Sequence, residues 1–412
     1  MLTKIFKTIK TDIFFAKSLT LLVILYPLLS VYAIEQVTLG TVCVFLLMLI
    51  IILTKLKVSL KWPKYFWLFF TYMFLSRFLF APDYNINSLF SLSLISFAIL
   101  LGLSCKYFDL QYGIKVYEIV VLICICFFFI QEIMYFEFGY RMVGLLPWIP
   151  LNVGPSNIEY ITRFRYEPRS ATFFLEPAHF AEYIIPLLAI ELFNKNNKKI
   201  INFYVILISV VILLLRSGTG ALLMALIWVF WFFYKLRNSS FLNKLLLIFL
   251  IVPGIVFSIY YYVNSEMGKE LTKRSSEFTG DSKSASAFIR IIRGFEFFAD
   301  FPVTNKLFGI NSPAKIKSFI SANGLDLIFS EGDLSFSCIQ SILVYGGIIG
   351  MFIYLIHFKY LLKKNCIEGK MVAVAFIGLS IISPIYLMGG MLLCYTLIYS
   401  YQQQYFIKER LG

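Results

Sequence analysis

The sequence predicts an all-α, polytopic integral membrane protein with about 12 transmembrane helices and two large outer loops. Of its 412 residues, 59% are hydrophobic and only 15% are charged, and the mean hydropathy is +0.81. A soluble domain has about 45–50% apolar and about 25% charged residues, so this composition excludes a soluble enzyme. Apolar runs of about 20 residues recur from end to end, which is typical of a multispan helical membrane protein.

The apolar runs define the expected spans in order. They cover residues 17–34, 37–54, 65–81, 87–104, 117–134, 178–194, 200–216, 219–235, 241–263, 334–357, 371–384 and 386–404. The segment Met1–Lys10 is basic and no small-residue cleavage site follows it, so we expect the first span to be retained. Between the last two spans, Pro384 and the pair Gly389-Gly390 indicate either a tight outer turn or a kink in one long helix.

The distribution of charge supports this topology. With both termini in the cytoplasm, the inner segments hold 22 of the 37 Lys and Arg residues and six acidic residues, a net charge of +16. The rest of the chain sums to −2. Cytoplasmic loops of membrane proteins carry such an excess of Lys and Arg. The formal charge of +14 is therefore explained by topology and anionic membrane lipid, and it gives no support to nucleic-acid binding.

Two long segments interrupt a single polytopic domain that spans residues 1–412. They run over 135–177 and 264–333, and both fall on the outer side of the expected topology. Loops of this length usually carry function. The seven cysteines are scattered and only two histidines are present, so we expect no metal site and no cofactor.

Arginine is segregated from lysine. The inner basic residues are 20 Lys and two Arg, whereas nine of the 11 arginines fall on the outer side. These nine are Arg77, Arg141, Arg163, Arg165, Arg169, Arg216, Arg274, Arg290 and Arg293. Because the guanidinium group is a planar, permanently charged fork that suits phosphate and carboxylate, the pattern suggests an outer face that grips an anion. The alternative is that these arginines only pair with acidic residues of the outer loops.

The first outer loop ends in a candidate helix start. Pro177 suits the first helical position, and Glu176 before it would then be the N-cap residue, with its carboxylate at the positive end of the helix dipole. His179 and Tyr183 follow three and seven residues after Glu176 and share its face. Glu182 would lie about one turn inside the membrane, where ionisable groups are usually functional. The alternative is a simple charged cap paired with Arg169.

The second outer loop contains two arginines three residues apart, Arg290 and Arg293. Apolar residues at 288, 291, 292, 295 and 298 predict an amphipathic helix that lies on the outer leaflet or caps a cavity. Both arginines would share one face and could clamp a pyrophosphate. The alternative is an ordinary surface pair of Arg293 with Glu296. Asp333 is a further candidate, which could also simply cap the tenth span.

Three short motifs resemble one known family. They are the run from Arg169 to Pro177, the turn Leu215-Arg-Ser-Gly-Thr-Gly-Ala-Leu222, and Asp333-Leu-Ser-Phe336 followed by Tyr345-Gly-Gly-Ile-Ile-Gly350. In this order and on this side of the membrane, they resemble Wzy-type polymerases of O-antigen and capsular polysaccharide, within the O-antigen polymerase and ligase superfamily. The turn Leu307-Phe308-Gly309 after an arginine helix also resembles that family. The layout of about a dozen spans with two large outer loops is similar across nearly the whole chain.

The resemblance implies a membrane glycosyltransferase bundle in the bacterial cytoplasmic membrane. Its substrates would be a growing glycan on undecaprenyl pyrophosphate as donor and one lipid-linked repeat unit as acceptor, joined on the outer face with inversion at the anomeric carbon. A flippase and a chain-length regulator would be partners. The implied catalytic residues are Arg169, Glu176, His179, Arg290 and Arg293. The implied substrate-binding residues are Arg163, Arg165, Tyr183, Arg216 and Asp333, without metal.

Two other functions compete with polymerisation. An O-antigen ligase carries a histidine late in its second large outer loop, and this chain has none between 264 and 333. A lipid-linked oligosaccharide flippase, or another transporter, also has about a dozen spans, but with short loops and charges deep in the bundle. The long outer loops and the mostly uncharged span centres favour the polymerase.

Overall fold

The computed structural model describes most of the chain. The described residues are 2–34, 37–54, 56–80, 89–152, 157–166, 169–194, 202–238, 260, 289–310, 316, 319–321, 336–363 and 365–411. Nearly all of the predicted span at 241–263 and most of the second outer loop, with Asp333, lie outside these residues.

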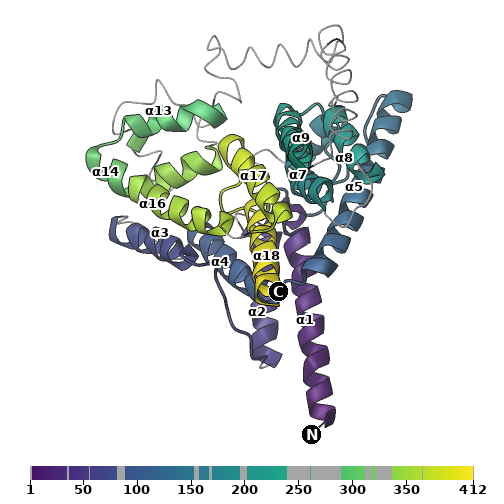
Figure 1. Cartoon of the computed structure of the whole chain (residues 1–412). Helices are drawn as coiled ribbons and strands as arrows, with labels where there is room; N and C mark the ends of the chain where they lie inside the picture. Colours follow the sequence, from purple (N-terminus) through teal and green to yellow (C-terminus); the bar gives the residue numbers. More distant parts are fainter. Residues whose placement is uncertain are drawn as a thin grey trace.

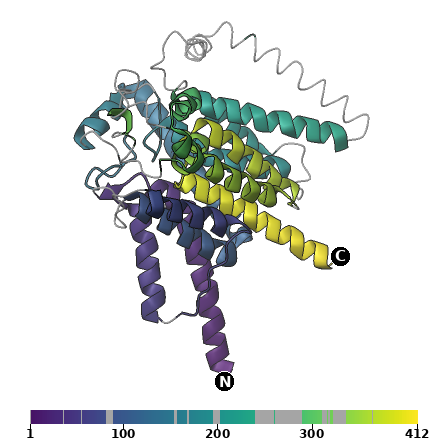
Figure 2. The same ribbon diagram turned by 90° about the vertical axis from the view of Figure 1, so that its left-hand side faces the viewer.

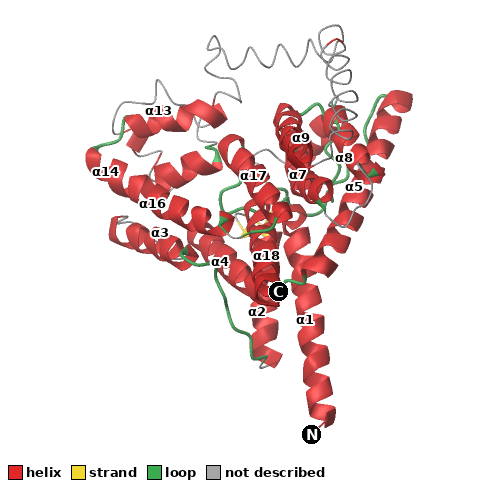
Figure 3. Cartoon of the chain, viewed as in Figure 1, coloured by secondary structure: helices red, strands yellow, loops and turns green. Residues whose placement is uncertain are grey.

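The described chain is nearly all-α, as predicted (Figures 1 and 3). Its helices are α1 (Leu2–Leu29), α2 (Leu39–Thr54), α3 (Phe66–Phe80), α4 (Leu89–Tyr107), α5 (Leu110–Phe138), α6 (Asn157–Tyr166), α7 (Pro177–Phe193), α8 (Phe203–Leu214), α9 (Gly218–Asn238), η2 (Ile289–Arg293), α13 (Gly294–Ala299), α14 (Val303–Phe308), α16 (Cys338–Leu362), α17 (Ile367–Ile382) and α18 (Gly389–Leu411). Two short strands, β1 (Ala33–Ile34) and β2 (Val37–Thr38), pair antiparallel between α1 and α2.

Apolar helices of membrane-spanning length indicate a membrane protein. Among the described residues, α5, α9 and α16 are long and apolar enough to cross a bilayer. Shorter apolar helices cover Ile13–Leu29, Leu39–Thr54, Phe66–Ser76, Leu94–Tyr107 and Phe203–Leu214. The count of about 12 spans stays a prediction.

Helix α7 lies at the centre of the packing rather than at a lipid-facing edge. Of its 17 residues, 15 are buried, so the helix is covered on all sides. It packs against α17, α9 and α8, and small residues allow the close approach. A Cβ added to Gly220 of α9 would lie 2.6 Å from Cβ of Ala181, so the start of α9 is pressed against the first turns of α7. The helix covers nearly the same residues as the predicted span at 178–194, and its crossing of a membrane stays a prediction.

The C-terminal pair of spans is joined by a turn and is not one kinked helix. Helix α17 ends at Ile382 and α18 begins at Gly389, and the two helices pack against each other. Leu387 in the turn has a left-handed backbone, with φ of 57°. A Cβ at Gly389 would lie 2.7 Å from Cα of Pro27, so the turn is seated on the end of α1. Of the two interpretations that the sequence allows, the turn is confirmed, and its position on the outer side stays a prediction.

Predicted inner segments contact one another at one end of the helices. The backbone N–H of Lys61 donates to the carbonyl of Gly102 (2.9 Å), and the carbonyl of Lys64 contacts Nδ1 of His357 (3.1 Å). At the other end, the N–H of Ala33 donates to the carbonyl of Pro150 (2.9 Å). Helices α1 and α2 extend away from the remaining helices, downward in Figure 2. Lys61 and Lys64 thus contact α4 and α16, whereas Ala33, before α2, contacts the segment predicted as the first outer loop.

Candidate functional site

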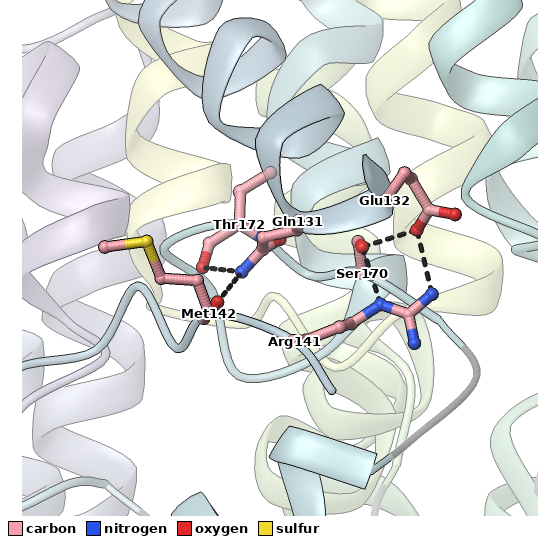
Figure 4. Close-up of polar contacts among 6 residues, drawn as sticks. All are labelled: Gln131, Glu132, Arg141, Met142, Ser170 and Thr172. Carbon is pink, nitrogen blue, oxygen red and sulfur yellow. Dashed lines mark hydrogen bonds and ion pairs between the residues drawn. The ribbon is translucent and has the colours of Figure 1, made fainter. Parts of the chain in front are cut away.

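The loop before α7 is held by the end of α5 through one buried amide side chain, that of Gln131. Its Nε2 donates to the carbonyls of Met142 (2.8 Å) and Thr172 (3.4 Å) (Figure 4). Its Oε1 accepts from the N–H of Thr172 (2.9 Å). Thr172 has a left-handed backbone with φ of 55°, which is costly for a residue with a Cβ and persists only where the surroundings hold it. Gln131 thus joins both ends of the first outer loop to one helix.

A second contact of α5 with the same loop is a buried ion pair. Nη2 of Arg141 lies 3.0 Å from Oε1 of Glu132, and Nε of Arg141 donates to Oγ of Ser170 (2.8 Å) (Figure 4). Ser170 donates in turn to Glu132. The guanidinium of Arg141 is fully buried and lies 3.8 Å from the ring centre of Tyr135. Arg141 is therefore paired with an acidic residue, which is the alternative to anion binding considered for the outer arginines.

These two contacts position Arg169, which precedes Ser170 and is half-buried. Arg165 lies near the end of α6, and its side chain is exposed. Its backbone carbonyl accepts from the N–H of Arg141 (2.9 Å). The structure therefore brings the segments of Arg165 and Arg169 together around Arg141. Arg163 lies on α6, and its side chain is outside the described part of the chain.

The predicted start of α7 is confirmed. Glu176 is the N-cap residue, with an extended backbone (φ −137°, ψ 150°), and Pro177 is the first helical residue. The carbonyl of Glu176 accepts from the N–H of His179 (3.1 Å), while its carboxylate makes no capping hydrogen bond. The side chain of Glu176 is exposed and that of His179 is half-buried. An acidic group at the positive end of the helix is thus presented at the surface.

Tyr183 and Glu182 lie deeper. The hydroxyl of Tyr183 donates to the carbonyl of Ile24 (3.1 Å), and its ring packs against Tyr117, so the structure places Tyr183 in the core between α1, α5 and α7. Glu182 is buried and accepts from the hydroxyl of Ser383. The carbonyl of Ser383 accepts from the N–H of Cys338 at the start of α16 (2.9 Å). Glu182 thereby connects α7 with the helix that follows the second outer loop.

Arg216 occupies the turn between α8 and α9. Its backbone is left-handed, with φ of 51°, and its side chain is half-buried. Ser217 caps α9, because its Oγ accepts from the N–H of Gly220 (3.3 Å). Since Gly220 lies against Ala181, five residues after Glu176, this turn sits at the same end of the structure as the start of α7.

Of the second-loop candidates, only the side chain of Arg293 is described. It is buried, and its Nη1 lies 3.0 Å from Oε2 of Glu296, the pairing considered as the alternative. Arg290 has a described backbone in η2, but its side chain and all of Asp333 lie outside the described residues. The assignment of Arg290, Arg293 and Asp333 to substrate stays a prediction.

A regular amphipathic α-helix was predicted around residues 288–298, but the structure has a π-helical turn, η2, followed by the short helix α13. Residues 289–293 form a π-helical turn, which places more residues in a turn than an α-helix does. The phase of the apolar pattern therefore shifts: Ile292 and Phe295 of the predicted stripe are exposed, while Arg293, Gly294 and Phe297 are buried. A Cβ at Gly294 would lie 2.7 Å from the side chain of Gln340, so this buried face rests on α16.

Two of the sequence motifs meet in space. Gly309, at the end of α14, and Gly347, within a kink of α16, have φ of 78° and 65°. A Cβ at Gly309 would lie 2.4 Å from the carbonyl carbon of Tyr345, and one at Gly347 would lie 2.3 Å from the carbonyl oxygen of Leu307. The motif Leu307-Phe308-Gly309 is therefore docked on Tyr345-Gly346-Gly347 by direct backbone contact.

Sequence reasoning did not single out Gln131, Glu132 and Ser170. The available signal was an amide and an acid side by side near the end of an apolar run, where polar groups need a partner. In the described part of the chain, no three His, Cys, Asp or Glu side chains form a group that could hold a metal ion.

The chain was compared with protein-family models and with curated protein sequences. No protein-family model matches the chain, and no curated protein sequence matches it. The resemblance to Wzy-type polymerases therefore rests on the motifs and on the layout of the chain.

Proposed function

We propose that this chain is a membrane glycosyltransferase that polymerises lipid-linked oligosaccharide repeat units on the outer face of a bacterial cytoplasmic membrane. It has about 12 spans, both termini in the cytoplasm and two large outer loops over 135–177 and 264–333. The donor is a glycan on undecaprenyl pyrophosphate, and the acceptor is one repeat unit on the same lipid. A flippase that delivers these substrates and a chain-length regulator are its partners.

One observation carries the proposal. Arg169 and Glu176 lie on a loop that Gln131 and Glu132 hold against α5, and the turn with Arg216 packs against the helix that Glu176 begins. An exposed carboxylate and half-buried guanidinium groups thus share one end of the structure. This combination suits a reaction that takes a proton from a hydroxyl group and releases a pyrophosphate anion.

The proposed step has defined roles for these groups. A sugar hydroxyl of the acceptor attacks the anomeric carbon of the donor, and the bond from that carbon to the pyrophosphate oxygen breaks. Glu176 takes the hydroxyl proton, with His179 as a second proton acceptor. Arg165, Arg169 and Arg216, together with Arg290 and Arg293, stabilise the negative charge on the leaving pyrophosphate.

The function is tested in a strain that lacks its own polymerase and carries this chain. Surface glycan separated on a gel should change from single repeat units to a ladder of polymer when the chain is expressed. Polymer that appears on the carrier lipid when the chain is expressed would equally support polymerisation, whereas a ligase would leave single repeat units. Single repeat units in both strains would contradict the proposal.

The arginine clamp predicts a graded response. Arg169→Ala or Arg216→Ala should raise the barrier by about 2–4 kcal/mol, which lowers polymer formation by about 30- to 1,000-fold. Arg169→Lys should restore only part of the activity, because lysine keeps the charge and loses the fork. The control is Arg237→Ala, an exposed residue in the last turn of α9, at the lysine-rich end. Wild-type polymer from the Arg169 and Arg216 variants at normal protein levels would remove them from the clamp.

The substitution Glu176→Gln distinguishes a role of Glu176 as a catalytic base from a role as the N-cap of α7. Glutamine keeps an oxygen acceptor and cannot take a proton, so a base predicts abundant, inserted protein with greatly reduced polymer. If the residue only caps α7, the variant should keep most of its activity, because the carboxylate makes no capping hydrogen bond. If Glu176 only neutralises Arg169, the loss should be relieved when Arg169 is also replaced by Gln. The measurement is polymer per amount of membrane protein.

A further inference from the structure

Helices α5 and α7 are joined at three levels. The contacts described above hold the loop before α7 against the end of α5. Further along α7, the hydroxyl of Tyr117 donates to the carbonyl of Tyr183, and the centres of the two rings lie 5.2 Å apart. At the last turn of α7, the carboxyl groups of Glu118 and Glu191 lie within hydrogen-bonding distance of each other. This third contact differs from the others because it joins two acidic groups.

The environment of Glu191 is unfavourable for a carboxylate. The residue is 6% exposed, and among the described residues its Oε1 has no hydrogen-bond partner. It lies in the last turn of α7, where the negative end of the helix dipole disfavours a further negative charge. The side chain of Asn202, the N-cap residue of α8, donates to it. One neutral donor does not compensate a buried charge that also faces a second carboxyl group.

The titratable groups around the pair are acidic or neutral. The hydroxyl of Tyr204 on α8 donates to the backbone carbonyl of Glu118 (2.9 Å), and Tyr401 of α18 is buried beside the pair. Both tyrosines lie within electrostatic range of the two carboxyl groups. Beyond Tyr401 lie Cys366 and Glu368, at the start of α17. None of these groups supplies a positive charge at neutral pH.

The described basic residues at these ends of the helices are directed elsewhere. Lys115 of α5 and Lys370 of α17 are exposed. Lys235, in the last turn of α9, has its Nζ 5.9 Å from the ring centre of Trp231. The connection 195–201, which contains three lysines, lies outside the described residues. Within the described part of the chain, the pair therefore needs another source of positive charge.

We propose that Glu118 and Glu191 share one proton, so that the predicted inner ends of α5 and α7 form a proton-binding site. The proton makes one carboxyl group a donor to the other, and a repulsive contact becomes a hydrogen bond. Release of the proton to solvent leaves two anions in contact, one of them buried, which drives the two helix ends apart. The site lies at the opposite end of the helix that Glu176 begins, and it does not depend on the proposed function.

The first test is the pH dependence of the thermal unfolding midpoint of the purified chain in detergent. In the unfolded chain both carboxyl groups are in water and have released their protons at neutral pH. The folded protein then binds one proton more, so the midpoint should fall as the pH rises. In Glu191→Gln, a neutral amide replaces the protonated group, and this part of the fall should disappear. Between the two proteins, the folding constant should diverge by up to about tenfold per pH unit.

The second test detects the proton in the unmutated protein. A protonated carboxyl group has an infrared C=O stretch that a carboxylate lacks. We expect such a band at neutral pH, its loss at alkaline pH, and its absence from both Glu118→Gln and Glu191→Gln. The matched control for both tests is Glu137→Gln, at an exposed position of α5, which should keep the band and the wild-type pH dependence.

Two results would overturn the proposal. One is equal pH dependence in the wild type and Glu191→Gln, and the other is a spectrum without a band that depends on both residues. A midpoint that then rises with potassium chloride, but not with choline chloride, would indicate a bound metal cation. A midpoint that falls when Lys195, Lys198 and Lys199 are replaced by Gln would indicate an ion pair. Neither test measures polymer, so failure of the proposed function and failure of the shared proton are distinguishable.

Discussion

Arg141→Ala is expected to lower the stability of the folded protein more than replacement of any other outer arginine with a described side chain. The change leaves the carboxylate of Glu132 at a buried junction without its cation, and breaking a buried ion pair from one side costs about 3–5 kcal/mol. It also removes the guanidinium from the face of Tyr135. The measurement is the thermal unfolding midpoint in detergent, together with hydrogen exchange of the segment 169–176.

Two variants serve as controls for Arg141. Arg165→Ala removes an exposed side chain whose residue contributes only its backbone carbonyl to Arg141, so it should leave the unfolding midpoint nearly unchanged. Glu132→Gln combined with Arg141→Ala should cost less than the sum of the two single changes, because the two charges are coupled. An Arg141→Ala protein as stable as the Arg165→Ala protein would contradict the ion pair.

Gly347→Ala is expected to have the second large effect, with loss of most folded protein from the membrane. Its backbone, with φ of 65° and ψ of −169°, lies in a region that is essentially restricted to glycine and costs an alanine about 1–3 kcal/mol. The added Cβ would also lie 2.3 Å from the carbonyl oxygen of Leu307 and 2.6 Å from the backbone nitrogen of Gly309. Because both neighbours are backbone atoms, no change of rotamer relieves the contact, and α14 must move away from α16.

Other glycines separate the two contributions. Gly139 has φ of 70° and no neighbour within 4 Å of an added Cβ, so Gly139→Ala should show only the conformational cost. At Gly218, an added Cβ has no neighbour within 4 Å and φ is not positive. Gly218→Ala should therefore leave the stability of the folded protein nearly unchanged. The order of protein abundance and of thermal midpoint should be Gly218→Ala, then Gly139→Ala, then Gly347→Ala. Equal effects at Gly139 and Gly347 would show that α14 is not docked on α16.

Local chemistry was sufficient for several features. The abundance of apolar residues and the length of their runs predict helices, and Pro177 after Glu176 predicts the start of α7, because a proline without an N–H costs nothing at the first helical position. Pro384 with Gly389-Gly390 indicates a break, although the choice between turn and kink needed the position of Gly389 against Pro27.

Periodicity could not predict where the π-helical turn lies or which face of η2 and α13 is buried. The apolar stripe over 288–298 assumes 3.6 residues in every turn, and one wider turn at 289–293 changes the phase of all residues after it. The sequence therefore predicted Arg293 to be a helical residue, and the tertiary structure decided that it is buried beside Glu296.

By itself, the sequence determined that this protein is helical and apolar, and where α7 begins. These properties depend on residues within one or two helical turns of each other. Only the tertiary structure decided which arginine is structural. Arg141 and Arg165 are both outer arginines by sequence, but only Arg141 meets an acid and a hydroxyl, Glu132 and Ser170, that come from separate segments. Burial depends on such distant neighbours, and a linear sequence does not contain their positions.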